Sequence, residues 1–140
     1  MLPRLPRDLY PRAAKQIELL REAAADGLGE AQTFLGYYYQ HGFGELQEDD
    51  ATAGGWYKAA ADNPEAGHTG YAALHYAHIQ RINNNPDEAI KYYRQAAAQG
   101  DLGGFYQQDA LFALALALST HAVGLTNDPG ELVLMYTAGW

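Results

Sequence analysis

One pattern of hydrophobic and polar positions occurs three times along this chain. Each copy has two large hydrophobic residues, a basic residue, a variable residue and two alanines, and the copies read LLREAA, WYKAAA and YYRQAA. They begin at Leu19, Trp56 and Tyr92, so successive copies are 37 and 36 residues apart. A fourth, partial copy ends the chain, because residues 127–136 align with residues 84–93 at a spacing of 43. Self-similarity at this period predicts a stack of short helical units.

A second helix is predicted between successive copies of the pattern. It is clearest at residues 29–39, which read GEAQTFLGYYY, and it has a counterpart at residues 66–78. Each two-helix unit can bury its apolar stripe only by stacking on its neighbours, which is how an α-solenoid is built. The sequence therefore predicts an all-α fold, an α-α superhelix (solenoid) of about three and a half two-helix repeats. The seven predicted helices span residues 11–26, 30–41, 49–62, 64–81, 86–99, 106–122 and 129–138.

The ends of the predicted helices carry recognisable residues. The Asn-Pro pair at residues 85–86 is typical of a helix start, and either Asp49 or Asp50 is expected to cap the helix that follows it. Gly27 and Gly42 stand where two helices should stop, and a left-handed residue is expected there. These signals support the division of the chain into short helices.

Length and composition fit one helical domain. The chain has 140 residues and no cysteine, so its stability must come from helix packing without disulfides. Alanine and tyrosine carry much of the hydrophobic fraction, which favours helices over strands. We expect residues 1–10, rich in proline and arginine, to form an extended arm, and residues 11–140 to form a single repeat domain.

Charge is distributed unevenly along the chain. The formal net charge is −8, but residues 1–21 carry +3, so the remaining residues carry −11. An acidic body repels phosphate and releases no counterions on binding it, so we expect no nucleic acid partner. The charge instead favours a protein partner with a basic surface.

The sequence contains no segment that predicts a membrane partner. Residues 1–12 lack the apolar core of a secretory signal. The apolar stretch ALFALALAL at residues 110–118 is too short to span a bilayer and predicts a buried helix. We therefore expect a cytoplasmic location, with a periplasmic or secreted location after signal removal as the alternative.

The repeated segments resemble the Sel-one-like repeat (SLR) family, a relative of the tetratricopeptide repeat. The best match lies within residues 23–58 and contains AAADGLGEAQ, LGYYY, GFG and DATAGGWYK. A second match is DEAIKYYRQAAAQGD at residues 87–101. Residues 64–82 depart from the family pattern, since AALHY replaces the leucine-glycine motif.

The resemblance implies a right-handed superhelix that binds a partner protein and has no shared active site. Members of the family act as adaptors, some of them bacterial, and small members can neutralise a toxin as immunity proteins. On this ground the chain is expected to be a protein-protein interaction module of that kind, and not an enzyme.

Aromatic residues on the inner helices are the expected binding positions. The three tyrosines at residues 37–39 lie about a hundred degrees apart on a helix, so one apolar stripe cannot bury them all. At least one should be exposed, whereas Tyr57, Tyr92 and Tyr93 should be buried in the seams between helices. Exposed tyrosine on a rigid helix offers a large contact area at low entropic cost. The predicted partner-binding residues on the concave surface are Tyr37, Tyr38, Gln40, His41, His75 and His78.

Three histidines support an alternative hypothesis. His68, His75 and His78 are separated by seven and three residues, which places them on one side of a helix. Clustered imidazoles can bind zinc, which would make the chain a metal-binding protein or a metal-dependent enzyme. However, the HExxH pattern is missing, and the single serine, Ser119, has no nucleophile motif around it. We therefore expect no catalytic residue, cofactor or metal, and keep the histidine cluster as the alternative.

The last predicted helix leaves two possibilities for how the chain assembles. Residues 129–138 complete only part of a fourth unit and show no obvious polar cap. An apolar helix in this position favours either a homodimer through the carboxy-terminal helices or a longer repeat array of which this chain is a part.

Overall fold

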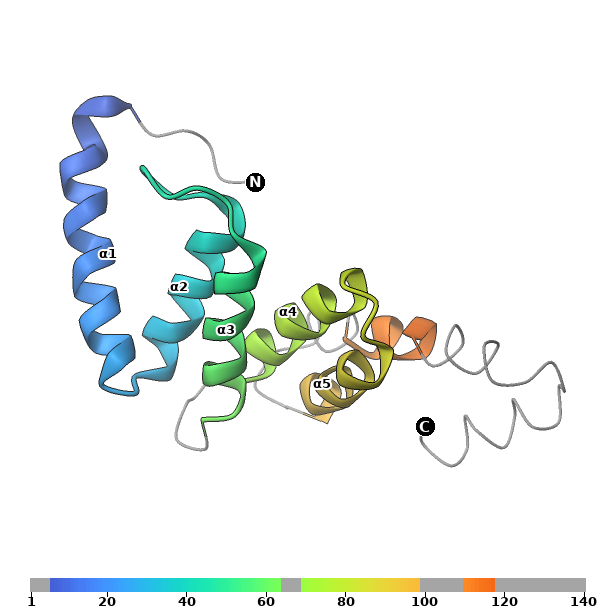
Figure 1. Cartoon of the computed structure of the whole chain (residues 1–140). Coiled ribbons are helices and arrows are strands. Elements are labelled where there is room, and N and C mark those ends of the chain that lie inside the picture. Colours follow the sequence, from blue (N-terminus) through green and yellow to red (C-terminus); the bar gives the residue numbers. More distant parts are fainter. Residues whose placement is uncertain (1–5, 64–68, 99–109, 118–140) are drawn as a thin grey trace, which may run out of the picture.

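The computed structural model describes residues 6–63, 69–98 and 110–117 of the chain (Figure 1). A short 3-10 helix, η1 (Arg7–Leu9), leads directly into α1 (Tyr10–Ala25). The helices that follow are α2 (Gly29–His41), α3 (Asp50–Ala61), α4 (Thr69–Ile82) and α5 (Pro86–Ala98). Residues 110–117 are also helical. The described residues contain no strand, so the all-α prediction is confirmed.

The predicted helix spans agree with α1, α2, α3 and α5 to within one residue at each end. Seven helices were predicted for the whole chain; in the part that the structure describes, six helical elements have defined bounds, in addition to the helical residues 110–117. One of them, η1, was not predicted: it closes with a 2.9 Å hydrogen bond from Leu9 N to Pro6 O inside the expected arm. The predicted helix at residues 129–138 lies outside the described residues. None of the described helices is long and apolar enough to cross a membrane.

Local sequence explains where these helices start and stop. Asp49 caps α3, since its carboxylate accepts hydrogen bonds from the backbone nitrogen of Thr52 (3.1 Å) and from its hydroxyl (2.6 Å). Gly27 and Gly42 follow α1 and α2 with φ of +92° and +72°, a conformation that residues with a Cβ rarely adopt. The expected acidic cap and both glycine stops are therefore confirmed, and each turn brings the next helix back beside the previous one.

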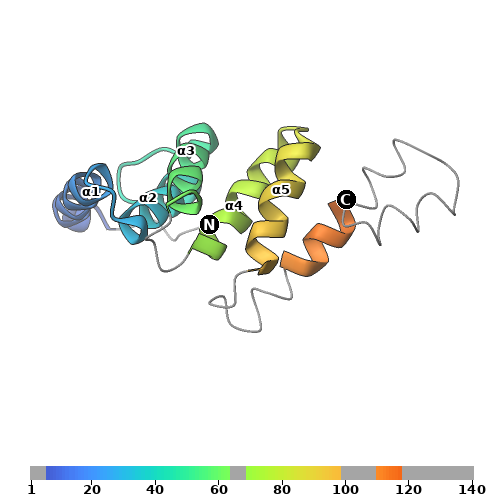
Figure 2. The same ribbon diagram turned by 90° about the horizontal axis from the view of Figure 1, so that it is seen from below.

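Each helix packs against the next one along the chain, and α2 also contacts α4 (Figure 1, Figure 2). This is the neighbour-to-neighbour packing of a helical solenoid. The larger group of buried side chains joins α3, α4, α5 and residues 110–117, and it includes Tyr57, Tyr92 and Tyr93, all buried as predicted. A smaller group joins α1 and α2 around Ile17 and Leu35.

A close approach between helices places Gly36 of α2 against the ring of Tyr57 in α3. A Cβ at Gly36 would lie 2.7 Å from Cδ1 and Cε1 of Tyr57, well inside van der Waals contact. The ring is held in place, because it is fully buried and its hydroxyl donates a hydrogen bond of 2.8 Å to Oε1 of Gln40. Glycine is therefore required at residue 36 for the distance between the two helices.

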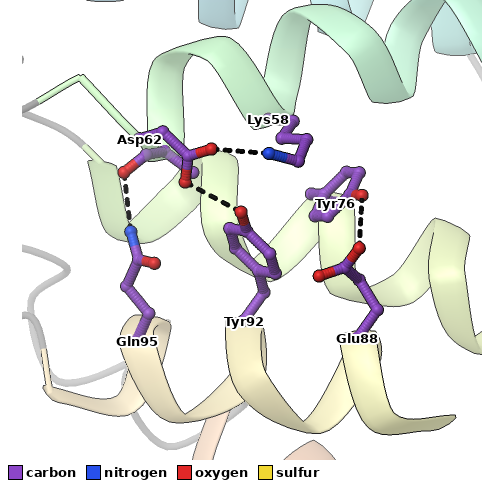
Figure 3. A network of polar contacts seen from close by, with 7 residues as sticks. Lys58, Asp62, Tyr76, Glu88, Tyr92 and Gln95 are labelled. Carbon is purple, nitrogen blue, oxygen red and sulfur yellow. Dashed lines mark hydrogen bonds and ion pairs between the residues drawn. The ribbon is translucent and has the colours of Figure 1, made fainter.

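A network of polar contacts joins α3 to α5 (Figure 3). Asp62 accepts hydrogen bonds from Nζ of Lys58 and from the hydroxyl of Tyr92, both at 2.8 Å. Gln95 donates a hydrogen bond of 2.6 Å to the backbone oxygen of Ala61, one of the carbonyls that the end of a helix leaves without a helical partner. The network therefore links two helices that are not consecutive in the chain.

Replacing Gly36 with alanine should destabilise the fold. The added methyl group would overlap the Tyr57 ring, and overpacking of this kind costs about 1 to 3 kcal/mol. The higher helix propensity of alanine offsets about 1 kcal/mol, so we expect the free energy of unfolding, measured by urea denaturation, to fall by up to about 2 kcal/mol.

Gly55→Ala is the matched control for this variant. Gly55 is also a helical glycine, in α3, but an added Cβ would meet no atom within 4 Å. This substitution should raise the stability slightly through helix propensity alone. Equal stability of the two variants would show that the contact between Gly36 and Tyr57 does not constrain the packing.

Candidate protein-binding face

Tyrosine and histidine side chains gather on one side of α2 and α4. On α2, the ring centroids of Tyr37 and His41 are 4.4 Å apart. On α4, the ring of His75 lies 4.3 Å from that of Tyr71 and 6.1 Å from that of His78. Spacings of three and four residues keep these side chains on one face of each helix. All five are partly buried, and we call them the Tyr–His row.

Both halves of the row lie near the buried ring of Tyr57, whose pKa is raised by burial and further by the nearby Tyr71 of α4 and Tyr37 of α2. This ring stacks against His75 of α4, with centroids 5.2 Å apart and planes inclined by 25°. Its hydroxyl reaches α2 and donates to Gln40, one of the predicted partner-binding residues. Gln40 therefore holds the ring beneath the row, and α2 and α4 are also in contact with each other.

Hydrogen bonds fix the arrangement of His78. Nε of Arg81 donates to the hydroxyl oxygen of Tyr93 at 3.1 Å, and the same hydroxyl shares a hydrogen bond with Nδ1 of His78, 2.7 Å away. The α4 end of the row is thereby tied to α5 through Tyr93.

Burial favours the uncharged form of two histidines of the row, His41 and His75. Burial, followed by the nearby His78 and His41, lowers the pKa of His75 to about 4. Burial also lowers the pKa of His41, although the negative charges of Glu48 and Asp50 act in the opposite direction. The His41 end of the row therefore lies within electrostatic reach of these two carboxylates.

Tyr38, also predicted to bind a partner, lies outside the row. Its ring stacks on Phe43 with centroids 4.2 Å apart, and its hydroxyl accepts a hydrogen bond of 3.0 Å from Gln16 of α1. The expectation that at least one tyrosine of residues 37–39 is exposed is corrected, because all three are partly buried. The reason is that α2 is covered on two sides, by α1 and by α3.

Two aromatic residues of this face were missed in the sequence. Phe34 is 52% exposed, precedes His41 by about two helical turns on α2, and has its ring centroid 6.3 Å from that of Tyr38. Tyr71 precedes His75 by four residues on α4 and packs directly on it. The helical spacing of both residues was visible in the sequence, and it could have identified them as members of one face.

The structure describes the proposed histidine cluster only in part, because His68 lies outside the described residues. His75 packs on the rings of Tyr57 and Tyr71. Across residues 6–63, 69–98 and 110–117, no group of three His, Cys, Asp or Glu side chains is arranged to hold a metal ion. The described part of the cluster therefore belongs to a packed aromatic face.

Comparison with protein families identifies the repeat. A family model described as Sel1 repeat matches residues 29–64 and 71–101. The first match contains the described helices α2 and α3, and the second contains α5 and most of α4. Each matched unit is thus a pair of helices, as the sequence pattern predicted.

Curated relatives carry similar sequences. DAP3-binding cell death enhancer 1 of rat (Rattus norvegicus) is 30% identical over 84% of this chain, and the mouse (Mus musculus) protein of the same name is 31% identical over 79%. The chain spans only 23% and 21% of the lengths of these relatives. No solved structure matches the chain significantly. The repeat matches coincide with the observed helix pairs, and the chain is therefore a Sel1-like repeat helical protein.

Proposed function

We propose that this chain binds a partner protein on the Tyr–His row, and that the row belongs to the concave surface expected from the sequence. The observation that carries the proposal is the proximity of the two halves of the row: the ring of His75 stacks on that of Tyr57, and His41 of α2 lies close enough to His75 to add to the effect of burial in lowering its pKa. Partly buried rings on rigid helices give a large contact area at low entropic cost. Tyr37, His41, His75 and His78 would contact the partner, and Tyr38 and Gln40 would hold the surface from behind.

The partner is proposed to present a basic side chain at the His41 end of the row. Aromatic faces attract cations, and Glu48 and Asp50 place negative charge near His41. The net charge of −11 beyond residue 21 acts in the same direction at longer range. Electrostatic attraction of this kind mainly accelerates association and selects the partner.

The family and the relatives support protein binding as the general function. Sel1 repeats suggest protein-protein interaction and generally occur in proteins that are not enzymes. The name of the rat and mouse relatives says that those proteins bind another protein, DAP3. The shared segment covers 84% and 79% of this chain, which supports the same kind of function here.

More specific versions of this function stay predictions. A bacterial adaptor and a toxin-neutralising immunity protein rest on the family resemblance, whereas the two relatives named above are mammalian. A homodimer through the carboxy-terminal helices involves residues 118–140, which lie outside the described residues. The identity of the bound partner would distinguish between these versions.

A metal-binding protein or metal-dependent enzyme that uses His68, His75 and His78 is the alternative function. The stacking of His75 on two tyrosine rings supports a packed face instead. Partner capture from native lysate with and without a chelator, together with the metal content of the purified chain, separates the two functions. Binding that survives the chelator supports the protein-binding function, and stoichiometric metal in a chain that captures nothing supports the alternative.

Removing two rings from the α2 side of the face should weaken partner binding. Phe34→Ala combined with His41→Ala should raise the Kd of the captured partner by at least about tenfold, because aromatic side chains dominate the energy of such interfaces. The partner is first identified by pull-down and mass spectrometry, and the Kd is then measured by biolayer interferometry with the purified partner.

Leu19→Ala is the matched control for partner binding. Leu19 is 53% exposed, almost the same as Phe34 at 52%, but it belongs to α1 and lies outside the row. This variant should bind like the wild type. A partner that loses affinity equally for both variants, or for neither, would contradict binding on the row.

Stability should fall in acid partly because of His75. The pKa of His75 is about 4 in the folded chain against an ordinary value of 6.5, so the unfolded chain takes up the proton first as the pH falls. The contribution of His75 is fully present above pH 6.5, is lost as the pH falls towards 4 and then levels off. The total loss is at most about 3 kcal/mol.

Comparison with His75→Gln isolates this contribution, because carboxylates also change their charge in acid. The free energy of unfolding is measured by urea denaturation of both proteins at about pH 7.5 and about pH 4.5. The loss between the two pH values should be smaller for His75→Gln than for the wild type. An equal loss would mean that His75 has an ordinary pKa in the folded chain.

A further inference from the structure

Two adjoining hollows lie between α1 and the segment of residues 42–49 that connects α2 to α3. Their volumes are about 640 Å³ and 190 Å³, and both are lined by Tyr10, Ala14 and Glu45. Because they share these residues, the hollows form one open depression, which we call the α1 groove. None of the residues that line it belongs to the Tyr–His row.

One face of η1 and α1 forms a wall of the groove. Its residues are Arg7, Tyr10, Ala14, Ile17 and Arg21, at spacings of three and four residues. Tyrosine, alanine and isoleucine occupy the middle of this wall, and an arginine stands at each end. Fourteen residues of helix separate the two arginines, which corresponds to about 20 Å along the axis.

The opposite wall is fixed against α1. A Cβ at Gly44 would lie 3.1 Å from Cβ of Ala13, so the backbone of the connecting segment lies close to the helix. The backbone nitrogen of Leu46 donates to Phe43 O at 3.0 Å, and that of Asp49 donates to Tyr39 O at 2.8 Å. Both walls of the groove are therefore defined by the packing of the fold.

The arginines at the two ends are placed to receive carboxylates. Nη2 of Arg21 donates a hydrogen bond of 2.6 Å to the hydroxyl of Tyr39, which positions the guanidinium group. Both Arg7 and Arg21 are exposed, and no ion pair to either forms among the described residues. Glu45 is the carboxylate that lines the groove, and it would repel an acidic group placed beside it.

We propose that the α1 groove binds a short extended segment of a partner protein with an acidic residue towards each end and apolar residues between them. About six extended residues span 20 Å. The acidic ends would pair with Arg7 and Arg21, the apolar residues would cover Tyr10 and Ala14, and Glu45 disfavours an acidic residue in the middle. The charge of +3 in residues 1–21 attracts such a segment, whereas the rest of the chain is acidic. The groove does not depend on the function proposed for the Tyr–His row.

A random peptide library displayed on phage tests this assignment. The full chain is the bait at low salt, and the Ala14→Trp chain serves for counter-selection, because the indole would fill the groove from an exposed position on α1. Circular dichroism and urea denaturation verify that Ala14→Trp still folds. We expect the enriched peptides to carry Asp or Glu towards both ends with apolar residues between.

An enriched peptide, labelled with fluorescein, then allows Kd measurements by fluorescence anisotropy. Arg7→Glu should raise its Kd by at least about tenfold, since it replaces an attractive charge with a repulsive one. Arg12→Glu is the matched control: it makes the same change of charge on an exposed residue of α1 that does not line the groove. Its effect should stay below about threefold.

Four outcomes would overturn the assignment. These are enrichment of basic peptides, enrichment that is indifferent to Ala14→Trp, equal losses of affinity for Arg7→Glu and Arg12→Glu, and failure to enrich any peptide. A second copy of this chain is the other possible occupant of the groove, and sedimentation velocity tests for it. If the chain self-associates, and if both the peptide and Arg7→Glu abolish this self-association, the groove binds a second copy of the chain.

Discussion

The contact between Gly36 and Tyr57 fixes the positions on which the rest of this structure depends. Because residue 36 has no side chain, the ring of Tyr57 lies directly against the backbone of α2. The same ring stacks on His75 of α4, and its hydroxyl donates to Gln40 of α2. A single buried side chain of α3 therefore sets the distances among three helices. A larger residue at position 36 would separate them, and the two halves of the Tyr–His row with them.

The proposed binding face and the hydrophobic core are parts of the same packing. Tyr57 and Tyr93 are buried, and their rings or hydroxyls support His75 and His78 at the surface. A charged imidazole would be poorly solvated in this setting, which is why burial lowers the pKa of His75. With His75 uncharged, the middle of the face offers aromatic surface, and carboxylates such as Glu48 place negative charge near its His41 end.

The uneven charge of the chain corresponds to two different surfaces. The amino-terminal 21 residues carry +3 and contribute both arginines of the α1 groove, whereas the residues beyond them carry −11. The two proposed sites therefore select partners of opposite charge, which reduces competition between them. A repeat segment that spans 23% of a relative such as the rat protein can in this way offer more than one contact surface.

The sequence by itself determined the helices of this protein. Their ends depend on local interactions, such as the Asp49 cap and the left-handed Gly27, and the repeat period located the helix pairs. For the same reason the sequence identified which tyrosines are buried in the seams. The sequence also predicted four members of the Tyr–His row, because residues three or four apart on a helix share one side. These are Tyr37, His41, His75 and His78.

Only the tertiary structure decided what each ring contacts. Tyr38 stacks on Phe43 and accepts a hydrogen bond from Gln16. Gln40 accepts a hydrogen bond from Tyr57, seventeen residues away in the chain. The α1 groove likewise forms between a helix and a segment that follows the next helix. Such contacts depend on how far apart the helices pack, and that distance is set by pairs of residues that no local pattern connects.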